Sequence, residues 1–241
     1  MNKKAIDVLA PFSVEQAEIV REQIRKTSVS QQIHDALRRR ILTLELAPGE
    51  NLSRNEIAVY YGVSQTPVRD ALMKLEEEGL IDIFPQSKTE VSRIDVAQAR
   101  ETQFLRMSLE IEIARRLAAA REPDRIAAAS AILARQRTAH EAGDLTYFAD
   151  LDRTFHRELF KAVGVGNLWE LITDRSGHID RLRKLNLPDP GKVSEILDYH
   201  ERILGAIADG KPELAEKLVR EHLSGTLAQV EQIVARHPEY F

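Results

Sequence analysis

The chain of 241 residues contains no cysteine, which excludes disulfides and thiolate-bound metals. It has no apolar run long enough to span a membrane, and its N-terminus lacks the apolar core of a signal peptide. An excess of basic residues is also absent, because 34 Lys and Arg stand against 38 Asp and Glu. We therefore expect a soluble, cytoplasmic protein with no membrane partner, long enough for two domains.

The pattern of residues 53–79 predicts two short helices around a tight turn. Ser53 begins an S-x-x-E arrangement, which marks a helix start, and Gly62 can adopt the positive φ that a sharp turn requires. Ser64 is placed to cap a second helix, and Gly79 lies just past its end. The segment therefore reads as a helix-turn-helix.

Two further features extend this motif. Residues 80–84 and 89–94 read as two short strands of a hairpin, or wing. A helix with an apolar stripe from Ile33 to Leu44 precedes the motif. The order helix, helix, helix, wing predicts a winged helix-turn-helix DNA-binding domain over residues 28–94. The alternative is a small helical domain with no nucleic-acid partner.

Residues 28–93 hold eight Lys and Arg against ten Asp and Glu, so the domain has no net positive charge. Its DNA contacts therefore have to come from a local patch of basic residues. The outward face at the start of the second helix can meet base edges and phosphates. Basic side chains elsewhere in the domain can neutralise phosphates. The candidate DNA-binding residues are Arg38, Arg54, Ser64, Gln65, Thr66, Arg69 and Lys88.

Residues 95–241 read as helical throughout. Asp95 can cap a helix that runs to about Arg121, and glycines and prolines punctuate the segments that follow. Six helices of roughly 16–25 residues result, and their short connections favour antiparallel neighbours. The predicted fold is therefore mainly α, with a winged helix-turn-helix followed by an antiparallel six-helix bundle. Residues 1–27 form an N-terminal extension, in which Val14–Lys26 is expected as one helix.

Four polar residues fall on predicted buried faces of this bundle. Asp152 and His156 are four residues apart and share one helix face. His200 and His222 each interrupt an apolar stripe of a different helix. Burying such groups without partners costs several kcal/mol, and a shared divalent cation removes that cost. Three imidazoles and one carboxylate suit Zn²⁺, Ni²⁺, Co²⁺ or Fe²⁺. The alternative for each histidine alone is a hydrogen-bonded core residue.

Motifs in both halves of the chain point to one family. In the N-terminal half they are Pro48-Gly49-Glu50-Asn51-Leu52, Gly62-Val63-Ser64, Thr66-Pro67-Val68-Arg69-Asp70-Ala71-Leu72 and Glu78-Gly79-Leu80. In the C-terminal half they are Asp152-x-x-Phe155-His156, Asn167, His200 and His222-Leu223. These motifs resemble GntR-family bacterial transcription regulators, in the FadR-like branch with an FCD effector domain. Gln65 stands where this family commonly has arginine, and the wing lacks the usual glycine.

The resemblance implies a homodimeric, metabolite-responsive regulator of operator DNA, most often a repressor. It also implies that Asp152 and the three histidines hold a divalent transition metal, with Zn or Ni most favoured. The effectors of the family are mostly small organic acids. Arg106 matches an arginine that commonly faces the effector pocket. His178 and Arg181, which share a helix face, are further candidates for binding a carboxylate effector.

Two alternatives concern the bundle. The first is a helical-bundle metalloenzyme, and the second is a regulator whose metal is purely structural. A di-iron bundle requires E-x-x-H helices, but no glutamate precedes His156, His200 or His222 by three residues. The H-E-x-x-H motif of zinc hydrolases does not occur. We therefore expect a regulator and not an enzyme, with the structural-metal alternative open.

Overall fold

The computed structural model describes residues 28–241 and divides the chain into two compact units that meet between Arg93 and Ile94. This division falls within one residue of the expected boundary at residues 94 and 95. The expected N-terminal extension, with its helix over Val14–Lys26, lies outside the described residues. No helix in the described part of the chain has the length and apolar character of a membrane span.

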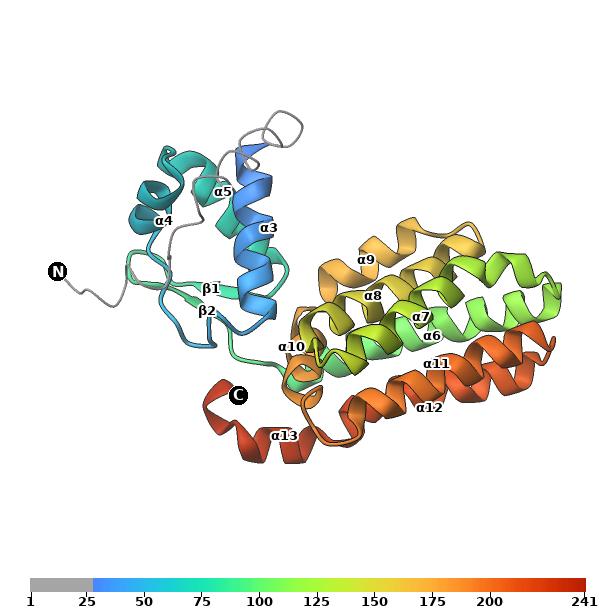
Figure 1. Ribbon diagram of the computed structural model, residues 1–241. Helices are drawn as coiled ribbons and strands as arrows, with labels where there is room; N and C mark the ends of the chain where they lie inside the picture. The colour runs from blue at the N-terminus through green and yellow to red at the C-terminus, as the bar shows by residue number, and fades with distance from the viewer. Residues whose placement is uncertain (1–27) are drawn as a thin grey trace. The chain divides into compact units, whose positions relative to one another are not determined.

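The first unit contains three helices and a two-stranded antiparallel sheet (Figure 1). Its elements in chain order are α3 (Val29–Leu42), α4 (Arg54–Tyr61), α5 (Gln65–Glu77), β1 (Ile81–Ile83) and β2 (Thr89–Val91). The strands are shorter than expected and pair with Ile81 opposite Val91. The winged helix-turn-helix predicted from the sequence is therefore present.

Local signals explain where these helices begin and end. The Ser53 hydroxyl accepts a hydrogen bond from the backbone N–H of Glu56, and Gly62 ends α4 with a φ of 63°. Ser64 occupies the position before α5 but makes no side-chain capping bond. Gly79 follows α5 with a φ of 71°. The two positive φ angles give the chain its turns on either side of α5.

The core of the first unit is built from the apolar stripes of α3 and α5, which pack together. The largest fully buried side chains on these stripes are Ile33, Leu37, Ile41, Leu72 and Leu75. Their spacing of three to four residues matches the helical period. The opposite face of α5 is left exposed, which makes it available for a partner.

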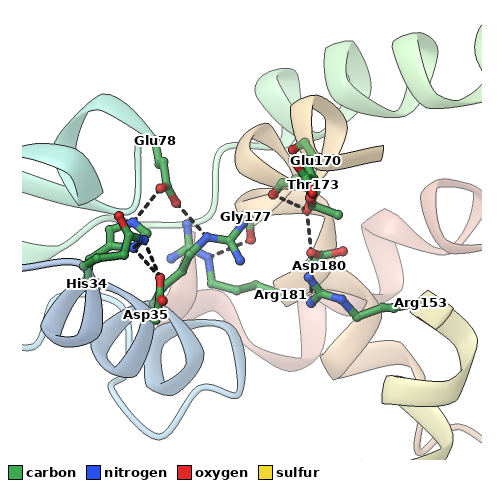
Figure 2. A network of polar contacts seen from close by, with 12 residues as sticks. His34, Asp35, Glu78, Arg153, Glu170, Thr173, Gly177, Asp180 and Arg181 are labelled. Carbon is green, nitrogen blue, oxygen red and sulfur yellow. Dashed lines mark hydrogen bonds and ion pairs between the residues drawn. The ribbon is translucent and has the colours of Figure 1, made fainter. Parts of the chain in front are cut away.

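A polar network ties α3 to the end of α5 (Figure 2). His34 Nε2 lies 2.6 Å from Glu78 Oε1, and Arg38 Nε donates to Glu78 Oε2 at 2.7 Å. The hydrogen bond to Glu78 outweighs burial and raises the pKa of His34. Burial opposes ionisation of Glu78, but His34 and Arg38 together hold the pKa of its carboxyl below the usual value.

This network corrects one expectation. We predicted Arg38 as a DNA-binding residue, but its guanidinium is paired with Glu78 and its side chain is only 14% exposed. A charge-assisted bond of this kind holds the donor in place. We therefore reassign Arg38 from the DNA surface to the anchoring of α5 on α3.

The second unit is all-helical (Figure 1). Its helices in chain order are α6 (Val96–Ala120), the short η1 (Pro123–Ile126), α7 (Ala127–Glu141), α8 (Leu145–Ala162), α9 (Asn167–Arg175), α10 (Gly177–Asn186), α11 (Lys192–Ala208), α12 (Pro212–Ala228), α13 (Val230–Arg236) and η2 (Pro238–Tyr240). Asp95 caps α6 as predicted, and α6 ends where Arg121 was expected. In Figure 1, α6, α7, α8, α11 and α12 run alongside one another as a bundle.

The bundle has eight α-helices across residues 94–241, whereas six were expected. The two additional boundaries fall at Ser176, between α9 and α10, and at Gln229, between α12 and α13. The boundary at Gln229 contains neither glycine nor proline. At Ser176 the next residue is Gly177, which begins α10, but this glycine was not read as a helix break. Past each boundary the chain enters a separate apolar cluster that includes Ile179, Leu182 and Ile233. Tertiary packing therefore accounts for the boundary at Gln229, whereas the boundary at Ser176 also has a local signal in the Ser176-Gly177 pair.

Candidate metal centre and nucleic-acid interface

Four ligand atoms from three helices of the bundle converge on one point. Asp152 and His156 lie on α8, His200 on α11 and His222 on α12, and their ligand atoms all lie within 4.8 Å of one another. His222 Nε2 is 3.2 Å from His200 Nε2 and 3.3 Å from His156 Nε2. Two ligands at about 2.0–2.1 Å from one metal ion stand roughly 3.0–3.4 Å apart. The imidazole spacing therefore fits a shared metal.

The protons on these rings are fixed by partners on the far side. His156 Nδ1 donates to Glu110 Oε2 at 2.6 Å, and His200 Nδ1 donates to Gln136 Oε1 at 2.9 Å. Each neutral ring then presents a bare lone pair at Nε2. His222 Nε2 can donate to only one of these two lone pairs. Asp152 Oδ1 is buried with no hydrogen-bond partner. The cluster thus holds more hydrogen-bond acceptors than N–H protons to satisfy them. A bound cation would accept the unused lone pairs.

Burial keeps the histidines neutral. It is the largest cause that lowers the pKa of His200 to about 4, and it also brings the pKa values of His156 and His222 well below the usual range. Burial opposes ionisation of Asp152, but His156 and His200, together with the permanent charges of Arg183 and Arg106, outweigh it and lower the pKa of the carboxyl. At neutral pH the cluster is therefore three neutral imidazoles and a carboxylate, the protonation state that metal binding requires.

One face of α6 supplies the groups beside this cluster. Glu110 accepts from Arg106 Nε with Oε1 at 2.5 Å and from His156 with its other oxygen. The guanidinium of Arg106 lies 5.3 Å from the Trp169 ring centre. Arg106 is 3% exposed, and its Nη2 has no hydrogen-bond partner. A buried guanidinium with an unused donor is suited to binding a carboxylate. Glu110 was not among the residues that we predicted for the site.

Replacing Glu110 with glutamine should weaken metal binding by about 10–100-fold, the usual effect of removing a carboxylate that orients a metal-bound histidine. The uncharged amide can no longer polarise the His156 ring in the same way. Competition against a calibrated chelator measures the change. The exposed Glu101→Gln on the same helix is the control. Equal metal affinity in Glu110→Gln and the parent would show that His156 does not depend on this carboxylate.

The other two predicted effector residues lie elsewhere. His178 Nδ1 accepts from the backbone N–H of Asp95, and Arg181 is fully buried and bonded to His178 at 3.0 Å. This face of α10 packs into the apolar cluster around Ile179 and Leu182. We therefore withdraw His178 and Arg181 as effector ligands, because they support the start of α6.

The opposite face of α10 bears Asp180 and Arg183, and the charge of Arg183 acts on Asp152, His156 and His222. Burial, and after it the charge of Arg106, lowers the pKa of Arg183 to about 10. The charge of Arg183 in turn helps to lower the pKa of Asp152. Arg183 was not among the effector-binding residues predicted from the sequence. No periodicity distinguishes the two faces of α10, since both carry charged residues.

The candidate DNA-binding residues of the first unit, Arg38 aside, are exposed. On α5 and just before it these are Ser64, Gln65, Thr66 and Arg69, and Arg54 begins α4. Lys88 on the wing lies 2.5 Å from Glu90 and 5.1 Å from the Phe84 ring centre. The Arg69 side chain is 61% exposed, and its contact with Asp70 is 3.5 Å long. Such a surface contact is weak, so Arg69 can turn to a partner.

Comparison with known families decides what this arrangement is. Residues 29–91 match the family described as "Bacterial regulatory proteins, gntR family", and residues 101–225 match the "FCD domain". The chain belongs to the GntR family. It is therefore a DNA-binding transcriptional regulator with an FCD domain.

Curated relatives agree with this assignment over nearly the whole chain. This GntR regulator is 38% identical to an uncharacterized HTH-type transcriptional regulator of Streptomyces ambofaciens, over 87% of this chain and 88% of that protein. It is 33% identical to the HTH-type transcriptional repressor RspR of Escherichia coli, over 92% of this chain and 98% of that protein. Family membership therefore covers both units.

A solved structure supports the fold of this GntR regulator. The chain aligns with Escherichia coli McbR/YncC with a TM-score of 0.69 at 22% identity, over 86% of this chain and 98% of that one. At this identity the likeness concerns the fold alone. It agrees with a winged helix followed by a helical domain, the arrangement that the sequence predicted.

Proposed function

We propose that this GntR regulator binds a short inverted-repeat operator as a homodimer and releases it when a small carboxylate binds beside a divalent metal ion. Two winged helices, one for each half-site, give a useful specific affinity for DNA. Release of DNA by the effector makes the protein a repressor. The Escherichia coli relative, which bears the name of a transcriptional repressor, supports that direction.

The observation that supports the sensing role is the pairing of the metal cluster with Arg106. Asp152, His156, His200 and His222 would hold the ion, with Zn or Ni favoured by the three imidazoles. A bound divalent ion supplies a Lewis-acidic position for one carboxylate oxygen. Arg106, through its unpartnered Nη2, would hold a carboxylate at the same place. Glu110 would position both the metal-binding imidazole and the carboxylate-binding guanidinium, because its two oxygens contact His156 and Arg106.

Linkage connects this site to the DNA. An effector shifts operator affinity only by its differential affinity for the bound and released states, typically about 1–3 kcal/mol. That range corresponds to roughly 5–150-fold in operator affinity. The candidate contacts to operator DNA are Arg54, Ser64, Gln65, Thr66, Arg69 and Lys88, all of which are exposed.

Replacing Arg106 with alanine should weaken the response to the effector while metal and DNA binding persist. The reason is that the metal supplies one anchor for the carboxylate and Arg106 the other. Operator binding by the metal-loaded protein is titrated against a panel of small organic acids, and the exposed Arg100→Ala on the same helix is the control.

Two results of this titration would count against the proposal. If Arg106→Ala responds to the acids as the parent does, Arg106 is only a structural partner of Glu110. If no organic acid changes the operator affinity of the metal-loaded parent, the metal is structural and the sensing role is wrong.

A further inference from the structure

The end of the chain packs against the point where the chain enters the second unit. Helix α13 and η2 follow α12 and lead to the start of α6 (Figure 1). The backbone N–H of Ile94 donates to the carbonyl of Tyr240 at 2.8 Å. We call residues 230–241 the C-terminal strap, because the last residues of the second unit hold its first residue in place.

Two anchors hold the strap itself. Ile233 is fully buried, and it lies with Ile94 in a small apolar cluster that is separate from the main core of the bundle. At the end of α13, Arg236 donates to the two carboxylate oxygens of Asp189 at 2.5 and 2.9 Å. The first anchor is apolar and buried, and the second is an ion pair nearer the surface. The strap is therefore fixed along its length and not only at its last turn.

The last residues of the first unit are held just as closely to their own domain. The N–H of Ser92 donates to the Leu80 carbonyl at 3.0 Å, and the Ser92 hydroxyl donates to the Gly79 carbonyl at 2.6 Å. Ser92 is also buried. Ser92 and Ile94 are thus fixed to different units, and only Arg93 lies between them in the sequence.

A connection of one residue restricts the motion of one unit against the other. Each residue contributes two soft backbone dihedral angles, so the φ and ψ angles of Arg93 supply most of the freedom of this hinge. Without the strap, Ile94 loses the acceptor of its N–H and part of its apolar contacts. The hinge then lengthens toward Asp95, whose N–H donates to His178. A longer flexible connection reaches more separations and orientations of its two ends.

We infer that the C-terminal strap is a positioning element, which confines the hinge to Arg93 and so makes the regulator selective for the spacing of its two half-sites. The inference rests on the proposed function, because it requires a homodimer on an inverted repeat. Each base pair added between the half-sites shifts one of them by about 3.4 Å and turns it by roughly 35° about the DNA axis. A short hinge cannot follow that change, so only one winged helix binds and the gain from pairing is lost.

Hydrogen exchange measured by mass spectrometry tests the strap without DNA. Ile233→Ala removes the buried anchor and should speed exchange at the Ile94 amide about 10-fold or more, because the local structure opens more often. Arg236→Gln removes the outer anchor without touching the core and should speed the same exchange about threefold. The controls are Ile126→Ala, which truncates a buried side chain of the main core, and Arg202→Gln, which breaks an exposed ion pair on α11. Neither control should change exchange at Ile94.

Binding to duplexes of different spacing tests the selectivity. The probes are the inverted repeat that the parent selects from a random-sequence pool, the same repeat with two base pairs added at its centre, and a single half-site. The parent should bind the lengthened repeat about 100-fold or more weakly than the selected one. In Ile233→Ala this loss should fall to about 10-fold or less, with single half-site affinity within about threefold of the parent. Arg236→Gln should lie between the two, and both controls should match the parent.

Three outcomes would overturn the inference, and only the last one also concerns the proposed function. If the Ile94 amide exchanges at the parent's rate in both strap variants, the strap does not hold the junction. If exchange becomes faster but the spacing preference stays that of the parent, the hinge does not set the spacing, while the proposed function stands. A parent that binds the inverted repeat no better than the single half-site contradicts the proposed function, and the inference fails with it.

Discussion

Replacing Arg69 with alanine should abolish specific operator binding while the winged helix stays folded. The side chain points outward from α5 and is 61% exposed, so its removal takes nothing from the core. An arginine that reads a base in the major groove is worth about 1–3 kcal/mol of discrimination. The proposed homodimer would lose this contribution at both half-sites, which makes the expected loss large.

A gel-shift titration with the operator and with a scrambled duplex measures the loss. Lys74→Ala is a matched control, since Lys74 is on the same helix but donates to Gln31 at 2.7 Å. Its operator affinity should stay near that of the parent. An Arg69→Ala protein that keeps operator affinity within about threefold would overturn the assignment of α5 as the recognition helix.

The second large effect concerns the metal. The purified protein should carry about one divalent ion per chain, and the His200→Ala/His222→Ala double variant should lose it. The Nε2 atoms of His200 and His222 are 3.2 Å apart, so both imidazoles can coordinate one ion. Removing two of four ligands leaves too few donors for a stable transition-metal site.

Elemental analysis after expression in metal-supplemented medium tests the stoichiometry, and thermal shift on adding Zn²⁺ or Ni²⁺ tests reversible binding. Binding of an ion to the folded state alone raises the melting temperature. The double variant His140→Ala/His237→Ala removes two histidines outside the cluster and should keep the metal. A parent protein with no metal and no thermal shift would contradict the assignment.

Metal content and DNA binding are measured independently, which keeps the two assignments separable. Arg69 and the four ligand residues belong to different compact units. Loss of metal with retained operator affinity would indicate that the ion serves sensing and not the DNA contact. Loss of both in the histidine variant, with the fold of the first unit intact, would instead indicate that DNA binding depends on the second unit.

The sequence by itself determined the winged helix and the convergence of the four candidate metal ligands. Gly62 and Gly79 allow the positive φ that the two turns require, and few other residues adopt it at low cost. The ligands were visible because each histidine interrupts an apolar stripe, and a buried polar group has to find a partner. Local backbone preference and the cost of burial are properties of the chain alone.

Only the tertiary structure decided which polar side chains face the site. The sequence favoured Arg181, yet Arg181 turns to His178, while Arg183 on the opposite face acts on Asp152. Arg38, likewise predicted to contact DNA, instead donates a hydrogen bond to Glu78. On a helix whose faces both carry charge, rotation about its axis follows from packing against its neighbours. That rotation depends on residues far away in sequence, which is why no local pattern predicted it.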